Sequence, residues 1–128
     1  MIHFDHIEVH VSNSEKYINF LTKLFNGGRA KKITDNNVFM FISCENLRIE
    51  VKEVQNNNNI INLDDSKIGF CLPCLRMKNA YEHIEKLNEV QIINVLNNPD
   101  GDCIFFKDHE NIIWHIKNYV HNDIFTNF

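Results

Sequence analysis

The sequence predicts an α+β fold built from two copies of a strand–helix–three-strand module. Each half of the chain opens with an apolar strand pattern that gives way to a helical one. A polar, Asn-rich stretch at about residues 55–65 separates the halves, and two hairpin segments align with each other. A duplication explains this common order of elements better than chance does.

The first module spans about residues 1–54. Residues 7–11 alternate between apolar and polar side chains, which is the period of a strand with one buried face. Residues 12–15 have the Ser-x-x-Glu spacing of a capping box, and apolar residues then recur at helical intervals as far as Phe25. The glycine pair at residues 27 and 28 ends this helix. Later strands are expected at residues 38–43 and 47–54.

The second module spans about residues 66–120 and has the same order of elements. A strand is expected at residues 68–72, and a helix is marked by Met77, Ala80, Tyr81, Ile84 and Leu87. The turn residues at 99–101 separate two of the three strands that follow. These strands are expected at residues 92–96, 103–107 and 112–119.

The two modules align along most of their length. Residues 41–52 match residues 106–117, where a Phe, a Glu, an Asn and a Lys coincide. The helices align at a constant offset. This alignment places Ile18, Leu21 and Leu24 on Tyr81, Ile84 and Leu87. The offset grows by only about two residues between the helix and the hairpin, so the duplicated module is the simplest account.

Composition excludes several classes of protein. With 44% hydrophobic and 23% charged residues, the 128-residue chain is neither disordered nor membrane-spanning. A net charge of −4 argues against nucleic-acid binding, and no signal peptide is visible. Four cysteines without an export signal are read as buried, reduced thiols in a cytoplasmic protein. The C-x-x-C pair Cys71 and Cys74 leaves redox or metal chemistry as an alternative.

Strand parity separates the side chains that pack on the helices from those on the opposite face. Two such sheets would form a curved, half-open mixed β-barrel with the helices outside, and its concave face would hold His6, Glu50, Gly69 and His115. His10 shares the parity of His6 and could act as a general base. The other residues expected on this face are Glu8, Arg48, Lys52, Cys71, Ile113 and Lys117. The residues expected in the core are Phe39, Phe41, Phe105, Phe106 and Trp114, and those expected on the surface are His3, His83, His109 and His121.

Three segments resemble the vicinal oxygen chelate superfamily, which includes glyoxalase I and the bleomycin- and fosfomycin-resistance proteins. Asp5-His6-Ile7, with the helix pattern behind it, is similar to the family's opening strand and helix. Residues 46–51 resemble its strand ending in a ligating Glu, and residues 106–116 resemble its last hairpin and strand. The resemblance covers almost the whole chain and implies a single glyoxalase-like domain.

The resemblance also implies a metal site. The family's four ligand positions fall on His6, Glu50, Gly69 and His115, so three of them can bind Zn, Ni, Mn or Fe. Glu50 or His10 would then move a proton in a lyase or isomerase reaction. Glu8, Arg48, Cys71 and Ile113 would line the substrate pocket, with Cys71 a possible soft ligand in place of Gly69.

A second interpretation is a metal-free protein that binds a small molecule, as drug-sequestering members of the family do. Gly69 has no side chain to bind metal, and losing one ligand weakens the reason to keep the others. His6 could then be a hydrogen-bonded residue of a polar cleft, and Glu50 an ion-pair partner of Arg48 or Lys52. In either case we expect a homodimer, with the tail at residues 121–128 packed on the domain or on a second subunit.

Overall fold

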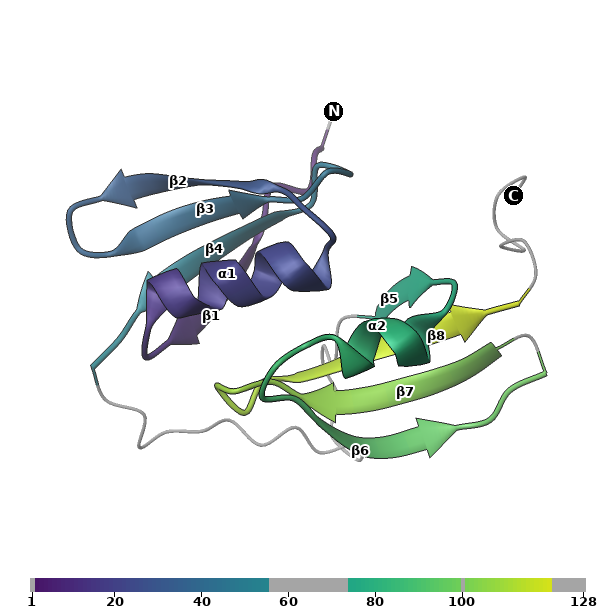
Figure 1. The fold of residues 1–128 in the computed structure, drawn as a ribbon. Coiled ribbons are helices and arrows are strands. Elements are labelled where there is room, and N and C mark those ends of the chain that lie inside the picture. The colour runs from purple at the N-terminus through teal and green to yellow at the C-terminus, as the bar shows by residue number, and fades with distance from the viewer. Residues whose placement is uncertain (1, 56–73, 100, 121–128) are drawn as a thin grey trace. The chain divides into compact units, whose positions relative to one another are not determined.

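The computed structural model describes residues 2–55, 74–99 and 101–120. The chain divides into two compact units, Met1–Ile61 (unit 1) and Asn62–Phe128 (unit 2). In the ranges described, each unit consists of one helix and one four-stranded sheet (Figure 1). No helix within these ranges is long and apolar enough to cross a membrane.

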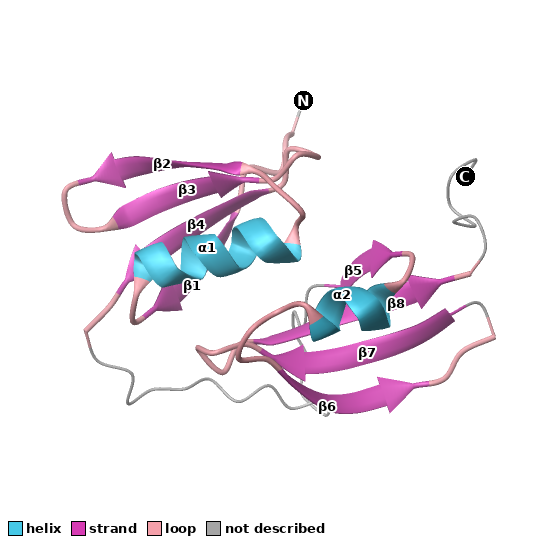
Figure 2. Ribbon diagram, in the orientation of Figure 1, coloured by secondary structure: helices cyan, strands magenta, loops and turns pink. Residues whose placement is uncertain are grey.

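Unit 1 has the order strand, helix, three strands, as the sequence predicts. Its sheet has the strand order β1-β4-β3-β2, with β1 parallel to β4 and the other neighbours antiparallel. Helix α1 covers one face of this sheet (Figure 2). The elements are β1 (Ile7–Val11), α1 (Ser14–Leu24), β2 (Arg29–Thr34), β3 (Val38–Ile42) and β4 (Arg48–Glu53).

Unit 2 repeats this topology. Its strand order is β5-β8-β7-β6, with β5 parallel to β8 and the other neighbours antiparallel. The two-module α+β fold class is therefore confirmed. The elements are β5 (Cys74–Met77), α2 (Ala80–Glu85), β6 (Gln91–Leu96), β7 (Gly101–Lys107) and β8 (Ile113–Tyr119).

Helix α1 has a defined start and end. The side chain of Asn13 accepts a hydrogen bond from the Lys16 amide at 3.0 Å, so Asn13 is the N-cap and the predicted Ser12 is wrong by one residue. At the other end Gly27 has φ +126°, and its amide donates to the Thr22 carbonyl at 2.8 Å. A glycine adopts this backbone conformation without the strain a side chain would add.

The core of each unit lies between its helix and its sheet. In β4, Ile49 and Val51 are buried while Arg48 and Lys52 are exposed, which confirms the parity assigned to this strand. The buried apolar side chains of unit 1 are Val11, Tyr17, Phe20, Leu21, Leu24, Phe41, Ile49 and Val51. Those of unit 2 are Ala80, Ile84, Leu87, Ile104, Phe106, Trp114 and Ile116.

Two strands differ from the sequence prediction. Strand β2 was assigned no residues, because its side chains are all exposed and give no alternating pattern. In unit 2 the strand next to β8 is β5, whereas the predicted strand at residues 68–72 lies outside the described residues. Met77 belongs to β5 and not to the helix, which begins at Ala80.

The two units hold the start of their helices in the same way. The backbone amide of Ser14 donates to Glu53 Oε1 at 3.0 Å, and the backbone amide of Ala80 donates to Asn118 Oδ1 at 2.9 Å. Glu53 lies at the carboxyl end of β4 and Asn118 near that of β8, the last strand of each unit along the chain. Ser14 and Ala80 are therefore equivalent residues of the duplicated module.

Strand register gives the same equivalence. Strand β1 places Val11 opposite Glu53, and β5 places Met77 opposite Asn118. Val11 therefore corresponds to Met77, an offset of 66 residues at the beginning of the module. The predicted helix alignment, which placed Leu21 on Ile84, is wrong by three residues.

This shift in helix phase changes which side chains are buried in α2. Tyr81, expected on the packed face, is 37% exposed and its hydroxyl donates to Asp102 at 2.9 Å. His83, expected at the surface, is buried, and His109 is half-buried. These surface assignments for His83 and His109 are wrong.

The thiols and aromatic residues differ in part from expectation. Cys44 and Cys74 are exposed and Cys103 is half-buried, so the predicted packing role is wrong for the cysteines in the described ranges. Among the expected core aromatic residues, three are buried and two are half-buried. The buried residues are Phe41, Phe106 and Trp114, and the half-buried ones are Phe39 and Phe105.

Candidate functional site

The candidate site of unit 1 lies on the sheet face opposite α1. Strands β1 and β4 are parallel neighbours, and their register places Glu8 directly opposite Glu50. His6 stands immediately before β1, one residue outside this register. Because side chains alternate along a strand, His6, Glu8 and Glu50 share the face that the buried Ile49 and Val51 leave free.

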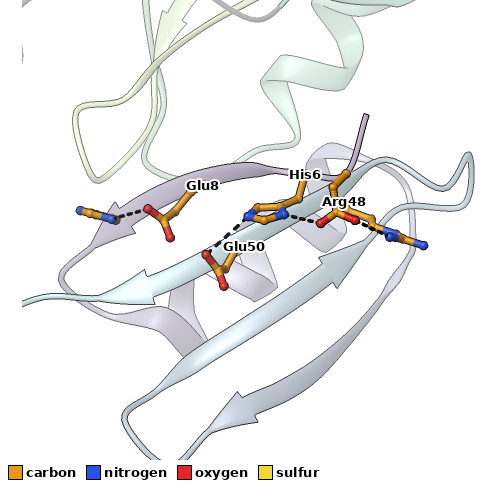
Figure 3. Close-up of polar contacts among 6 residues, drawn as sticks. His6, Glu8, Arg48 and Glu50 are labelled. Carbon is orange, nitrogen blue, oxygen red and sulfur yellow. Dashed lines mark hydrogen bonds and ion pairs between the residues drawn. The ribbon is translucent and has the colours of Figure 1, made fainter. Parts of the chain in front are cut away.

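His6 lies between two carboxylates (Figure 3). Its Nδ1 is 2.6 Å from Asp5 Oδ2, and its Nε2 is 3.6 Å from Glu50 Oε2. Arg48 Nη1 in turn donates to Asp5 Oδ1 at 3.2 Å. Asp5 therefore fixes the His6 ring from one side, and the other ring nitrogen faces Glu50.

The surrounding charges favour the protonated imidazole. The hydrogen bond with Asp5 raises the pKa of His6, partial desolvation opposes this, and the charges of Asp5, Glu50 and Glu8 add to the increase. The same hydrogen bond lowers the pKa of Asp5, with a smaller contribution from Arg48. Asp5 thus remains an anion wherever His6 titrates.

Glu8 and Glu50 are neighbouring carboxyl groups on parallel strands. The contact between the two side chains raises the pKa of Glu50 and lowers the pKa of Glu8, because two adjacent carboxyl groups resist carrying their negative charges together. Glu8 Oε2 also lies 3.0 Å from His10 Nε2. The structure therefore brings together the five predicted site residues of unit 1, which are His6, Glu8, His10, Arg48 and Glu50.

The chemistry of His6 and Glu50 fits a divalent metal. An imidazole and a carboxylate suit first-row divalent ions, and a metal-binding histidine commonly donates its other ring N–H to a carboxylate, as His6 can to Asp5. The pair is only part of a site. Among the described residues, no group of three or more His, Cys, Asp or Glu side chains could hold a metal ion.

His115 lies on β8 of unit 2, on the face opposite α2. Its ring packs edge-on against Phe105 at 4.7 Å, and its Nδ1 is buried with no hydrogen-bond partner in the described part of the chain. Burial lowers the pKa of His115, so its neutral, metal-binding form is favoured. Strand register places Cys74 opposite His115, as Glu8 stands opposite Glu50.

The remaining site predictions have different outcomes. Ile113 is half-buried and shares the parity of His115, whereas Gly69 and Cys71 lie outside the described residues.

Sequence reasoning missed the contribution of Asp5. It was read as part of a family motif and given no role of its own, although it holds His6 and pairs with Arg48. An aspartate directly before a candidate histidine is a signal that could have suggested this hydrogen bond to the imidazole.

Solved structures resemble this chain, whereas no protein-family model and no curated protein matches it. The fosfomycin resistance protein FosX from Listeria monocytogenes, crystallised with Mn(II) and a dihydroxypropylphosphonic acid, is 18% identical with a TM-score of 0.66. The match covers 94% of this chain and 93% of that chain. A glyoxalase family protein from Bacillus cereus is 11% identical with a TM-score of 0.69, over 91% and 93% of the two chains.

A glyoxalase/bleomycin resistance protein/dioxygenase domain from a Frankia species extends the comparison. It is 13% identical, with a TM-score of 0.69 over 96% of both chains. Identities this low establish the architecture and leave the reaction open. The strand order, the duplicated topology and these neighbours agree with the sequence resemblance: the chain has the fold of the vicinal oxygen chelate superfamily.

Proposed function

We propose that this chain is a metal-dependent enzyme acting on a small molecule that carries two neighbouring oxygen atoms. The observation that carries the proposal is the arrangement of His6 between Asp5 and Glu50, with Nε2 directed to the Glu50 carboxylate at 3.6 Å. His6 and Glu50 would hold Zn, Ni, Mn or Fe, and His115 would supply a third ligand. The bound ion would polarise the substrate oxygens and stabilise negative charge that develops on them.

The residues around this pair would handle the proton. Glu8 stands opposite Glu50 beside His6, and His10 Nε2 lies 3.0 Å from Glu8 Oε2, so a proton could pass between carboxylate and imidazole at this edge. Such an arrangement suits a lyase or isomerase that abstracts a proton next to a carbonyl oxygen. Arg48 and Ile113 would contact the substrate.

Metal content tests this proposal directly. Protein purified without chelators, and then supplied with zinc, nickel, manganese or ferrous iron, should retain one equivalent of one of them. His6→Ala and Glu50→Gln should lose the ion, whereas His3→Ala, which changes an exposed histidine near the same strand, should keep it. Failure to retain any of the four metals at stoichiometric level would reject the metal-dependent function.

A metal-free binding protein is the second candidate. It is favoured by Gly69, which the family resemblance places at a ligand position and which has no side chain to bind a metal. A thermal-shift screen of small molecules distinguishes the two functions. Stabilisation in the presence of a chelator supports binding alone, and stabilisation that always requires metal argues against it.

We also propose that the two units form one glyoxalase-like domain that pairs as a cytoplasmic homodimer. This extends the family resemblance, in which two modules close a site within one chain or across two chains. Light scattering coupled to size-exclusion chromatography gives the mass in solution. A mass near 15.1 kDa, that of one chain, would contradict the dimer.

A further inference from the structure

A cavity opens on the sheet of unit 1 beside the candidate metal pair. Its volume is about 440 Å³, within the range typical of small-molecule sites. It is lined by Lys31, Lys32, Ile33, Met40, Ile42 and Arg48. No residue of this cavity except Arg48 has a part in the site described above.

Strand register connects the cavity to the candidate metal pair. Lys31 stands opposite Met40 across β2 and β3, and Met40 stands opposite Glu50 across β3 and β4. The three side chains therefore form one row on the face that His6 also occupies. Arg48, at another edge of the cavity, contacts the carboxylate that holds His6. A molecule in this cavity would lie next to Glu50.

The lining combines an apolar floor with positive charge. Ile33, Met40 and Ile42 supply apolar surface, and Lys31 and Arg48 supply cations at its edges. The ammonium of Lys32 lies 6.0 Å from the centre of the Phe39 ring, so part of its interaction is directed there. Arg48 is already paired with Asp5. Neither lysine has an ion pair among the described residues, and Lys31 differs from Lys32 in having no aromatic ring contact there either.

We infer that this cavity binds the anionic end of an amphiphilic small molecule, with Lys31 as the main charged contact and the Ile33–Met40–Ile42 surface as the apolar one. The ligand class is a short alkyl chain that ends in a carboxylate or phosphate group. The inference rests on the proposed function only in regarding this molecule as a substrate, because the contacts themselves require no metal.

Methyl NMR of the full chain tests the inference without metal. Protein labelled at its methionine methyl groups and kept in a chelator is titrated with hexyl phosphate, hexanol or hexyltrimethylammonium. Met40 reports on the cavity, and Met77, on β5 of unit 2, serves as the internal control. We expect a saturable shift of Met40 with hexyl phosphate and a weaker response to the neutral and cationic probes. Equal responses to all three probes would overturn the assignment of an anionic ligand.

Two variants test the role of Lys31. Lys31→Gln should weaken binding of hexyl phosphate about fivefold, the upper range for an exposed ion pair, and Lys31→Arg should restore part of it. Lys23→Gln removes an exposed lysine from the last turn of α1 and should leave binding unchanged. Unchanged binding in Lys31→Gln would refute the inference. Metal retention is measured separately, so failure here would leave the metal-dependent function standing, and loss of that function would leave this binding site standing.

Discussion

Asp5→Asn should weaken divalent-metal binding while leaving the fold intact. Carboxylates that orient a metal-binding histidine typically contribute about 10- to 100-fold in metal affinity. Because the Asp5 side chain is 70% exposed and its hydrogen bond to His6 is short at 2.6 Å, we expect a loss near the lower end, about tenfold. The variant keeps the size of the side chain and removes the charge that fixes the His6 ring.

The pH of the measurement determines the sign of the effect. Asp5 raises the pKa of His6, so protons compete with the metal more strongly in the natural sequence than in the variant. Well above the pH range in which His6 titrates, the imidazole is neutral in both proteins, and only the lost orientation of the ring affects metal affinity. As the pH falls through the range where His6 titrates, the difference in apparent affinity should narrow.

Isothermal titration with manganese or zinc at several pH values measures this difference. Asp35→Asn, which neutralises an exposed aspartate in the turn between β2 and β3, is the matched control and should bind as the natural sequence does. Equal losses in the two variants would assign the effect to overall charge. A difference that does not change with pH would refute the assigned contact between Asp5 and His6.

Three further predictions concern the frame that holds the site. Glu53→Gln should lower the melting temperature at pH 7, and this effect should shrink as the pH falls below 4.5, because the hydrogen bonds from the Ser14 amide and the Asn37 side chain lower the pKa of Glu53 and stabilise its ionised form. That stability is present above the ordinary pKa of 4.5 and is lost as the pH falls through the lower folded value. Asn118→Ala removes the equivalent, uncharged acceptor in unit 2, so its destabilisation should not depend on pH in this range. Asp108→Ala should lower the free energy of unfolding in urea by about 3 kcal/mol. The reason is that buried Asp108 accepts hydrogen bonds from two backbone amides and from Trp114 Nε1. A loss below about 1 kcal/mol would contradict this. Gly101→Ala should reduce the yield of folded protein, because an added Cβ would collide with the backbone oxygen of Asn118 at a residue with φ +139°. A yield and a melting temperature equal to those of the natural sequence would contradict this.

The strands with one buried face could be predicted from the sequence. Ile49 and Val51 alternate with exposed neighbours in β4, and the same pattern identifies β1 and β8. An edge strand such as β2 gives no comparable signal, because neither of its faces is buried and four of its six residues are Arg, Lys or Thr. Strand β5 gives a weak signal, because its four residues alternate only between exposed and half-buried side chains and none of them is fully buried.

The helix alignment shows a second physical limit. A shift of three residues is close to one helical turn, so the apolar stripe of α1 matches that of α2 nearly as well at an offset of 63 as at 66. Only contacts between elements resolve this ambiguity, through Glu53 at Ser14 and Asn118 at Ala80. Strand alternation, by contrast, predicts the sheet face on which His6 and Glu50 lie. The hydrogen bond of Asp5 could not be predicted, because it depends on side-chain geometry that no periodicity encodes.

The two modules share their strand order and pairing but differ in the side chains on the sheet face opposite the helix. At matched positions in the register, unit 1 has the carboxyl pair Glu8 and Glu50, and unit 2 has Cys74 and His115. In the proposed site, one carboxylate and two neutral imidazoles would bind a divalent ion, and this set of ligands leaves the ion with net positive charge. An anionic substrate would neutralise that charge. The cations that line the cavity beside Met40 also favour an anionic ligand. The metal and the Lys31-dependent anion should therefore each bind more tightly when the other is present.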